Sequence, residues 1–503
     1  MSEERITWLS LVLEIFAASV LVVFVGLVLM VAVLYFIDKR QTKQTIRRNY
    51  PVIGRFRYWF EHLGEFFRQY FFALDREEMP FNRAQRSWIY RAAKDVDSTL
   101  AFGSTANINH PGAILFVSHP FPSLGEDAAK TCAKVIGPYC RNPYQAKSFF
   151  NISAMSYGAI SKPAVQALSR GAAKAGCWYN TGEGGLSPYH LEGGSDLVYQ
   201  IGTAKYGVRD KRGGLSDDKL QEVAAHPQVK MFEIKISQGA KPGKGGILPA
   251  GKVTEEISEI RGIPVGEASI SPNGHKDIRS VDELIDVIAR VREVTGKPVG
   301  FKLVIGGTDV LKQLCEKVIA RGVEDYAPDF ITVDSADGGT GAAPQSLMDH
   351  AGMPIHESLP WVVDMLKHYG LRERVKVIAS GKLVNPVEVA WALCTGADYI
   401  CSARGFMFAL GCIQALQCNK NTCPTGITTH DPELQQGLVP EDKAARVANY
   451  VKNMHYEVGM IAHSCGVNEP RELNRSHARL VIEPGLSKTL EEHYARRVVF
   501  ADS

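Results

Sequence analysis

Short apolar runs alternate with amphipathic segments along the chain from Lys147 onward. The apolar runs predict eight strands, at Ser148–Met155, Trp178–Asn180, Leu197–Ile201, Met231–Ile236, Val299–Ile305, Phe330–Val333, Val375–Ala379 and Tyr399–Cys401. Helical spacing of apolar residues predicts helices at Ser161–Ala175, Val281–Val294, Val310–Ala320 and Val387–Leu393. Such alternation is typical of parallel βαβ units, and about eight units predict an α/β fold, a closed (β/α)8 TIM barrel. A doubly wound sheet is the alternative, which the lack of a G-x-G-x-x-G motif after the first strand weakens.

The stretch Leu9–Ile37 is almost wholly apolar, with Glu14 as its only charge. About 20 residues of apolar helix suffice to span a bilayer. Basic residues follow the stretch instead of preceding it, at Lys39, Arg40, Lys43, Arg47 and Arg48. We therefore expect an N-terminal transmembrane helix, a single-pass anchor in the cell membrane, with the chain beyond Asp38 in the cytoplasm. A cleaved signal peptide is the alternative, but its apolar part would be shorter and its basic residues would come first.

These patterns divide the chain into four expected parts. Residues 1–48 form the anchor, 49–146 an aromatic and basic linker and leader, 147–431 the β/α barrel with a cysteine loop, and 432–503 a C-terminal helical extension. The aromatic and basic segment from Tyr50 to about Tyr90 either lies in the bilayer interface or packs onto the main domain. Residues Ala101–Gln145 show Pro and Gly without a clear period, which predicts irregular structure.

Charge and cysteine content narrow the function classes. The net charge of +3, from 57 Lys and Arg against 54 Asp and Glu, gives no general case for a nucleic-acid partner. Ten cysteines in 503 residues are too sparse for a disulfide scaffold and indicate a reduced compartment. Three of them, Cys412, Cys418 and Cys423, form a C-x5-C-x4-C run before Pro424. Thiolates crowded in this way bind soft metals or pair with one another, and the Cys-Pro ending is typical of iron–sulfur ligands, although cysteines are also often buried as small apolar side chains.

The predicted strands end in segments rich in glycine and polar residues. These are Ser153–Gly158, Asn180–Gly185, Lys235–Gly243, Lys302, Asp334–Gly341, Ser380–Lys382 and Ser402–Gly405. Active sites of β/α barrels are built from the loops that follow the strands, and phosphate binds after the last two strands. We therefore expect a phosphate site at Ser380–Gly381 and Ala403–Gly405, with Arg404 supplying charge. Any one of these glycine turns alone is explained by a tight loop.

Several of these motifs, in this order, resemble the FMN-binding synthase domain of glutamate synthase. The matching blocks are Met155–Ser161, Asn180–Gly185, Lys235–Gly246, Ser271–Ser280, Lys302–Val304, Asp337–Pro344 and Gly411–Gly426. The resemblance implies FMN across the barrel mouth and a [3Fe–4S] cluster held by Cys412, Cys418 and Cys423. It also implies an oxidoreductase acting on CH–NH2 groups, which reductively aminates 2-oxoglutarate with ammonia to give glutamate.

The resemblance assigns roles to individual residues. Glu183, Lys235 and Lys302 are the expected catalytic residues: Glu183 handles protons or positions ammonium, and Lys302 lies near flavin N1, where a cation stabilises the reduced flavin. The expected substrate-binding residues are Lys235, Gln238, Lys241, Arg261 and Ser280. The expected cofactor-binding residues are Met155, Ser156, Thr181, Lys302, Asp337, Gly338, Gly339, Ser380, Gly381, Arg404 and Gly405. The alternative for each of these lysines is a solvated surface charge. The alternative for His275 and Asp277 is a capping arrangement at the start of the helix that begins at Val281.

The sequence departs from the large glutamate synthases in its N-terminal part, which has no cysteine before Cys132 to serve as a glutaminase nucleophile. We therefore expect free ammonia or a separate amidotransferase as the nitrogen source, and electrons from ferredoxin, a reductase subunit or a membrane carrier. Methylamine, giving N-methylglutamate, is an alternative substrate. A flavin oxidoreductase acting on another 2-oxo or 2-hydroxy acid is a second alternative. A hydroxy-acid oxidase would need a histidine base near an arginine on the last strands, and no histidine lies beside Arg404 in the sequence. A non-catalytic scaffold is a third, but the glycine and cysteine motifs are intact.

Overall fold

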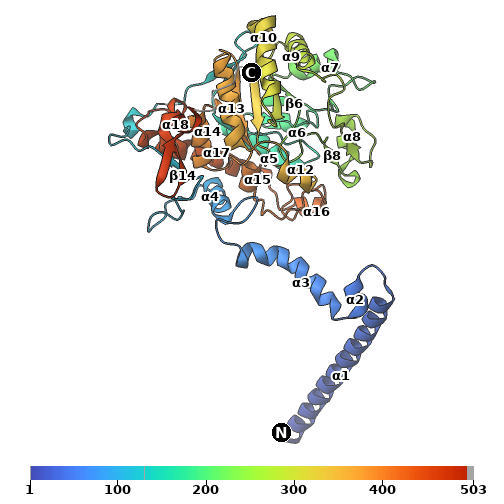
Figure 1. Ribbon diagram of the computed structural model, residues 1–503. Coiled ribbons are helices and arrows are strands. Elements are labelled where there is room, and N and C mark those ends of the chain that lie inside the picture. Colours follow the sequence, from blue (N-terminus) through green and yellow to red (C-terminus); the bar gives the residue numbers. More distant parts are fainter. Residues whose placement is uncertain (1, 130, 496–503) are drawn as a thin grey trace. The chain divides into compact units, whose positions relative to one another are not determined.

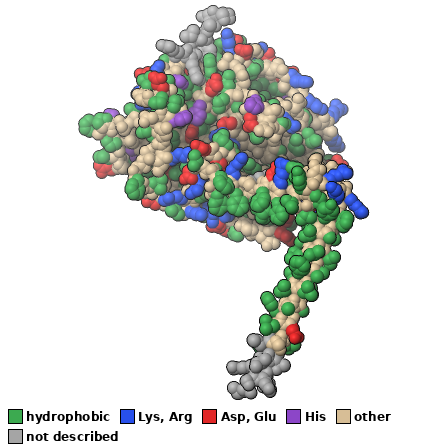
Figure 2. Space-filling model, turned by 60° about the horizontal axis from the view of Figure 1, so that its bottom comes forward, with side chains coloured by type: hydrophobic (Ala, Val, Ile, Leu, Met, Phe, Trp, Pro, Cys, Tyr) green, Lys and Arg blue, Asp and Glu red, His purple; other side chains and the backbone are tan. Residues whose placement is uncertain are grey.

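The computed structural model describes residues 2–129 and 131–495, and the chain divides into two compact units, Met1–Arg83 and Ala84–Ser503 (Figure 1). The first unit contains α1 (Ser2–Arg40), α2 (Thr45–Asn49), α3 (Gly54–Phe67) and a π-helical turn at Arg68–Phe72. Within α1, the 31 residues Ser10–Arg40 are long and apolar enough to cross a membrane. Hydrophobic side chains cover the part of this helix that Figure 2 shows in colour.

The second unit is built around a closed barrel of eight parallel strands, as the sequence predicts. The strands are β4 (Phe150–Ile152), β5 (Tyr179–Asn180), β6 (Leu197–Ile201), β7 (Val229–Lys235), β10 (Val299–Val304), β11 (Phe330–Asp334), β12 (Lys376–Ser380) and β13 (Tyr399–Ser402). They follow one another around the barrel in chain order, and β13 pairs with β4 to close it. Each strand overlaps one of the eight predicted apolar runs. Because parallel strands buried on both sides are nearly continuous in apolar residues, such runs are a strong signal.

Helices surround the barrel. They are α5 (Lys162–Ala175), α6 (Pro188–Glu192), α7 (Asp217–Ala225), α9 (Val281–Thr295), α10 (Asp309–Arg321), α13 (Ile355–His368), α14 (Pro386–Thr395) and α17 (Pro440–Ser464). The four predicted helices correspond to α5, α9, α10 and α14. The sequence reasoning missed α7, which is only nine residues long, and α13, whose interior Pro360 reads as a helix break.

The C-terminal part completes this ring. Helix α17 packs against α5 and α14. The contact with α5 is close, since a Cβ added at Gly171 would come 2.5 Å from Cβ of Val447. Helix α17, which begins after the boundary expected at residue 431, therefore packs onto the helices that surround the barrel. After α17 the chain adds a pair of antiparallel strands, β14 (Ala478–Glu483) and β15 (Leu486–Thr489), and the short helix α18 (Leu490–Tyr494).

The expectation of irregular structure over Ala101–Gln145 is wrong at three short strands. Strand β1 (Ile114–Phe116) joins β14, and β2 (Lys134–Ile136) forms a hairpin with β3 (Tyr144–Ala146). Ile136, Tyr144 and Ala146 of the hairpin are buried in one cluster with Trp178 and Tyr399 of the barrel. Strands of three residues are too short to show a period in the sequence. The hairpin nevertheless contributes to the barrel core.

Two connections on the barrel bear on function. The long connection between β7 and α9 contains the strand pair β8 (Ile247–Leu248) and β9 (Ser269–Ile270) and the helix α8 (Glu255–Arg261). The connection after β13 contains α15 (Arg404–Leu410), the cysteine run and α16 (Pro432–Gln435). Helix α4 (Arg83–Ala93) meets this second connection, where the Tyr90 hydroxyl donates to the carbonyl of Cys412 at 2.6 Å.

Candidate active site

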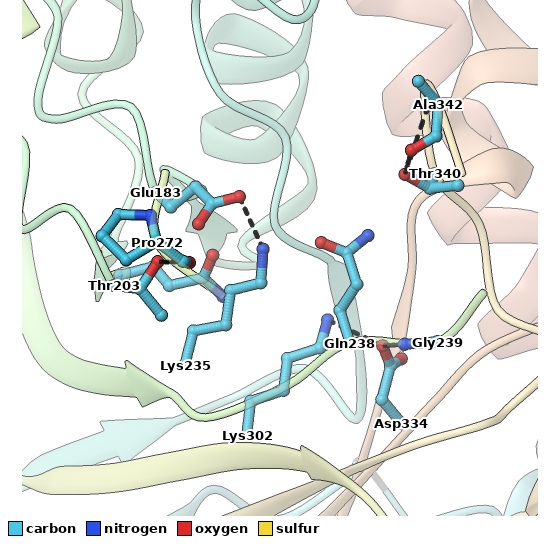
Figure 3. Close-up of polar contacts among 12 residues, drawn as sticks. Glu183, Thr203, Lys235, Gln238, Gly239, Pro272, Lys302, Asp334, Thr340 and Ala342 are labelled. Carbon is cyan, nitrogen blue, oxygen red and sulfur yellow. Dashed lines mark hydrogen bonds and ion pairs between the residues drawn. The ribbon is translucent and has the colours of Figure 1, made fainter. Parts of the chain in front are cut away.

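Two lysines stand side by side at the carboxyl end of the barrel. Lys235 ends β7 and Lys302 lies near the end of β10, and the two residues are direct register partners on these adjacent parallel strands. Figure 3 shows both side chains rising from the strands toward the same region, with Gln238 beside Lys302. The site therefore lies where the expected barrel places it, at the ends of the strands.

Lys235 is paired with Glu183. The Lys235 Nζ lies 2.7 Å from Glu183 Oε1, and both side chains are mostly buried, at 11% and 17% exposure (Figure 3). Glycines wall the carboxylate, since a Cβ added at Gly202 would come 2.6 Å from Glu183 Oε2 and one at Gly246 2.8 Å from Oε1. Burial opposes ionisation of Glu183, but Lys235, Lys241 and Arg261 together hold its pKa below the ordinary value. Glu183 is therefore a carboxylate at neutral pH.

Two further cations lie in the electrostatic range of this pair. Burial and the neighbouring Lys235 lower the pKa of Lys241 to about 8, although Glu183 opposes the shift. Arg261 is 6% exposed, and one of its Nη atoms donates to the carbonyl of Tyr157 at 2.9 Å. The Arg261 Nε is buried without a partner in the described part of the chain. Buried cations left short of anions favour a bound acid, because desolvated charge is stabilised only by a partner.

Lys302 has its own carboxylate. Its Nζ lies 3.3 Å from Asp334 Oδ2, which also accepts from the Gly239 N–H at 2.8 Å. Burial lowers the pKa of Lys302, but Asp334 and Glu233 outweigh it and raise the pKa above the ordinary value. The Gln238 amide donates to the carbonyl of Gly339 at 3.0 Å, which ties the loop after β7 to the loop after β11. Lys302 is thus a fixed positive charge at the barrel mouth.

The loops after β11, β12 and β13 meet at the rim. Lys382 Nζ lies 2.8 Å from Asp337 Oδ2, and Arg404 donates to the carbonyl of Asp337 at 3.0 Å. A Cβ added at Gly339 would come 2.8 Å from Arg404 Nε, and one at Gly381 2.5 Å from Ser335 Cβ. Burial lowers the pKa of Arg404 to about 10, which leaves it charged at neutral pH. Glycine backbone beside two cations fits the FMN phosphate expected from the sequence.

The structure also joins the expected cofactor residues at the ends of β4 and β5. The Tyr179 hydroxyl donates to the carbonyl of Met155 at 2.8 Å. A Cβ added at Gly182, next to Thr181, would come 2.7 Å from the Ser156 backbone nitrogen. All three expected residues, Met155, Ser156 and Thr181, are buried. Gly338 and Gly405 lie in the loops after β11 and β13, and Ser380 ends β12 beside Asp334.

Ser280 is placed differently from the other expected substrate residues. It is exposed at the start of α9, where its hydroxyl accepts from the Glu283 backbone at 3.2 Å as the helix cap. The alternative capping pair is not at this position: His275 contacts the Lys235 carbonyl at 2.9 Å, and Asp277 pairs with Lys205. The contacts described for Ser280 are thus those of a helix cap.

A buried polar layer beneath the two lysines was missed by the sequence reasoning. Glu233 is 3% exposed and accepts from Asn180 at 2.9 Å, Gln200 at 2.6 Å and Thr332 at 2.6 Å. These four side chains come from β5, β6, β7 and β11, so the layer crosses the inside of the barrel. A charged residue inside the apolar run Met231–Ile236 was the available signal, because a buried carboxylate requires partners.

The three cysteines lie in one loop with unusual backbone. Gln414, Leu416 and Asn421 all have positive φ, at 58°, 55° and 60°, which is uncommon for residues other than glycine. Hydrogen bonds from Thr425 and Thr428 offset the effect of burial and lower the pKa of the Cys423 thiol. The ammonium of Lys252, itself 2% exposed, donates to the carbonyls of Cys418, at 2.9 Å, and Thr428.

This donor set has the chemistry of an iron–sulfur site, with three thiols and a nearby buried cation. The sulfur atoms are not drawn together, since within residues 2–129 and 131–495 no three His, Cys, Asp or Glu side chains are arranged to hold a metal ion. The loop does reach the barrel mouth. His430 contacts the carbonyl of Gly158 at 2.8 Å, and the Ser161 N–H donates to Ile427 at 2.8 Å. The cysteine loop therefore abuts the Met155–Ser161 segment.

The fold and site define a parallel (β/α)8 barrel protein with a cluster of buried cations and carboxylates at the carboxyl ends of its strands. Residues 123–468 match the conserved region in glutamate synthase. The chain is 38% identical over 488 residues to the glutamate synthase large subunit-like protein YerD of Bacillus subtilis (strain 168), covering 90% of this chain and 92% of that one. The chain belongs to the glutamate synthase family.

Other relatives match a smaller part. The archaeal-type glutamate synthase (NADPH) of Thermotoga neapolitana is 37% identical over 330 residues, which are 65% of this chain and 61% of that protein. Among solved structures, a mutant flavocytochrome b2 with benzoylformate is similar with a TM-score of 0.47 and 16% identity, over 89% of this chain and 91% of that one.

Proposed function

We propose that this chain is an FMN- and iron–sulfur-dependent glutamate synthase-like oxidoreductase. It would convert 2-oxoglutarate and ammonia to glutamate with electrons from a partner. The observation that carries the proposal is the Glu183–Lys235 pair, 2.7 Å apart, with buried Lys241 and Arg261 in electrostatic range and Lys302 on the adjacent strand. The names of the relatives, glutamate synthase large subunit-like protein and glutamate synthase (NADPH), support the same reaction.

The cations suit a dicarboxylic oxo acid. 2-Oxoglutarate carries two carboxylates, and Lys241 and Arg261 offer two buried positive charges to receive them. Gln238 contributes an amide at the same mouth (Figure 3), where its Nε2 donates to the Gly339 carbonyl at 3.0 Å. Charge-assisted hydrogen bonds from such groups fix the acid's orientation. An acid with one carboxylate would leave one cation uncompensated, which disfavours it.

Glu183 and Lys235 suit the proton transfers of imine formation. Ammonia adds to the oxo carbon, and loss of water gives 2-iminoglutarate, which two electrons and two protons convert to glutamate. Glu183, held as a carboxylate, accepts the proton that ammonium must lose before it attacks. Lys235 lies within hydrogen-bonding distance of Glu183 and donates a proton to the departing oxygen.

The proposed cofactors take up the rest of the rim. A [3Fe–4S] cluster would be held by Cys412, Cys418 and Cys423. FMN would be held by Met155, Ser156, Thr181, Lys302, Asp337, Gly338, Gly339, Ser380, Gly381, Arg404 and Gly405. When bound, FMN would supply the hydride and the cluster the single-electron steps that deliver electrons to it. The fixed charge of Lys302 would favour an anionic reduced ring beside it.

The partners follow from the same proposal. Electrons would come from a ferredoxin, a reductase subunit or a membrane carrier, and nitrogen from free ammonia. Helix α1 would be a single-pass anchor in the cell membrane, with the barrel on the cytoplasmic side. The largely apolar 31-residue span Ser10–Arg40 and the basic residues at its end support this placement. We propose no nucleic-acid partner, because the net charge is only +3.

Anaerobic single turnover tests the reaction. The photoreduced protein is mixed with 2-oxoglutarate, with or without ammonium, while flavin absorbance and glutamate are measured. Flavin reoxidation that requires ammonium, with glutamate formed, is the expected result. Reoxidation with methylamine only, giving N-methylglutamate, would replace ammonia as the substrate. Absence of reoxidation with cofactors intact would contradict the 2-oxoglutarate assignment and redirect the search to other acids.

A separate test addresses the anchor. A chain lacking residues 2–37 is expected to leave carbonate-washed membranes, while the full chain stays with them. Attachment of the shortened chain after the carbonate wash would contradict the role of α1.

A further inference from the structure

Helix α3, the second helix after the apolar α1, has an exposed apolar face. This aromatic face of α3 consists of residues at helical spacing, namely Phe56, Trp59, Phe60, Leu63 and Phe67, together with Ile53 just before the helix. Ile53, Phe56, Trp59 and Phe60 are 74%, 56%, 54% and 59% exposed. The turn after α3 adds Tyr70, Phe71 and Phe72, which are also exposed. A contiguous apolar surface of this kind marks an interaction site, because water disfavours it.

Exposed cations accompany the aromatic face. Lys43, Arg48, Arg57 and Arg68 lie on the surface of the same unit, before, within and after α3. Figure 2 shows Lys and Arg side chains gathered at the end of the hydrophobic α1. A helix with aromatic residues on one side and basic residues elsewhere is typical of segments that lie in a membrane interface. Cations at the membrane interface attract anionic lipid headgroups.

A buried carboxylate fixes the turn between α1 and α3. Asp38, near the end of α1, is fully buried and accepts from Arg47 of α2 at 3.0 and 2.6 Å. It also accepts from Arg55 of α3 at 2.7 and 2.8 Å, and from the Val52 N–H at 3.0 Å. Charge-assisted hydrogen bonds to two arginines are strong and directional. We call these three side chains, Asp38, Arg47 and Arg55, the arginine clasp.

The backbone of the turn is adapted to the clasp. Val52 has φ of 68°, a conformation that is strained for a β-branched residue, and its N–H is one of the donors to Asp38. A Cβ added at Gly54 would come 2.9 Å from the carbonyl of Ile46, so glycine allows α3 to begin directly against α2. Strained backbone persists where surrounding contacts hold it. The three helices are therefore joined by a defined elbow.

We propose that the aromatic face of α3 lies in the interfacial layer of the membrane that α1 spans, and that the arginine clasp turns the chain from spanning that membrane to lying along it. The inference rests on the proposed anchoring by α1. The occupant of the face is the lipid bilayer. The arginine clasp connects α3 to the membrane-spanning α1, and the exposed cations complement the charge of anionic headgroups. The alternative that this segment packs onto the main domain becomes an outcome of the test.

Trp59 provides the probe. The full chain is reconstituted in phosphatidylcholine–phosphatidylglycerol vesicles, with and without brominated phosphatidylcholine, which quenches tryptophan fluorescence by contact. The difference between the wild type and Trp59→Phe isolates the Trp59 signal from the other five tryptophans. Trp8→Phe, near the start of α1, is the matched control for the anchor. We expect the Trp59 signal to be blue-shifted and strongly quenched by the brominated lipid.

Contrary outcomes separate the two proposals. An unquenched Trp59 signal, with the protein still resistant to carbonate extraction, overturns the interfacial placement and leaves the anchor intact. Loss of carbonate resistance by the full chain overturns the anchor itself. A Trp59 signal that changes on dilution of the protein in the membrane points to a second copy on this face and also overturns the lipid assignment.

Asp38→Asn tests the clasp. It removes the charge that holds Arg47 and Arg55, so we expect weaker quenching of Trp59 with carbonate resistance unchanged. Asp75→Asn is the matched control, because Asp75 is 65% exposed and pairs only loosely, at 3.5 Å, with Arg83. Quenching of Trp59 in Asp38→Asn equal to that of the wild type would show that the clasp does not set the position of α3.

Discussion

Lys235 and Lys302 are direct register partners on β7 and β10, yet each ammonium is held by a different carboxylate, Glu183 for one and Asp334 for the other. Two like charges on neighbouring strands repel unless each is compensated. The separate carboxylates allow the two lysines to serve two tasks in the proposed reaction. The first pair handles protons on the substrate, and the second fixes a charge where the cofactor is expected.

Replacing Lys302 by methionine tests its proposed role beside the flavin. The variant is expected to bind FMN but to be harder to reduce, because a positive charge no longer stabilises the reduced ring. A loss of about 1.4 kcal/mol corresponds to a fall of about 30 mV in a two-electron midpoint potential. Redox titration measures this shift. Lys317→Met, on the surface, is the control, and a Lys302→Met potential equal to the wild type would remove Lys302 from this role.

Glu183→Gln keeps the shape of the side chain and removes its charge. We expect kcat to fall by about 10²- to 10³-fold, within the usual range for loss of a general acid or base. Steady-state assays with 2-oxoglutarate and ammonium measure the change, and unchanged flavin content checks that the fold is retained. A variant with wild-type kcat would mean that another group moves the proton.

The lowered pKa of Lys241, about 8, predicts a pH dependence of substrate binding. Below this pH the ammonium is charged and attracts a substrate carboxylate. As the pH rises through 8 the charge is lost, so the KM for 2-oxoglutarate should rise. The measurement is KM against pH at a fixed, saturating concentration of free ammonia. Lys241→Arg keeps its charge throughout and should flatten the profile; an equally steep profile in this variant would assign the titration elsewhere.

Cys418→Ser should remove most of the iron and the visible absorbance of the cluster while FMN stays largely bound, because a three-cysteine site has no spare ligand. Iron and flavin are measured per protein. Cys394→Ser, a buried cysteine in α14, is the matched control and should keep its iron. Equal iron content in the two variants would rule out Cys418 as a ligand.

Glu233→Ala should lower stability, because it leaves the buried donors of Asn180, Gln200 and Thr332 without an acceptor. We expect a loss of about 3 kcal/mol in the free energy of unfolding, since each orphaned buried group costs about 1–3 kcal/mol. Urea unfolding measures it, with the exposed Glu373→Ala as control. A loss of similar size in both variants would show that the hydrogen bonds of the polar layer do not stabilise the fold.

Much of the barrel and its rim could be predicted from the sequence. The strands are buried on both sides, so each appears as an apolar run, and parallel strands bring their carboxyl ends to one rim. Lys235, Lys302 and Arg404 could therefore be expected near one another although they are far apart in the chain. The family resemblance added Glu183, Lys241 and Arg261, whose clustering with Lys235 the structure supports through their shared effect on the pKa of Glu183.

Other features depend on contacts that no local pattern encodes. The partners of Glu233 lie on three other strands, and only the order of strands around the barrel brings them together. Strand β2 has three residues and gains its stability from the barrel core. Ser280 was expected to bind substrate because of the resemblance to the family, but its position at the start of α9 makes it a helix cap. The arginine clasp depends on a bend at Val52 whose conformation its residue type disfavours.

The register of β7 and β10 also governs which changes in chain length the site tolerates. Side chains alternate between the two faces of a strand, so a shift by one residue exchanges the inward set for the outward set. Deleting Gly300 from β10 would turn Lys302 from the barrel interior toward the helices, although the composition would hardly change. Insertions in the connection between β7 and α9 do not change the register of the two strands. Variation in length among related chains should therefore spare the strands.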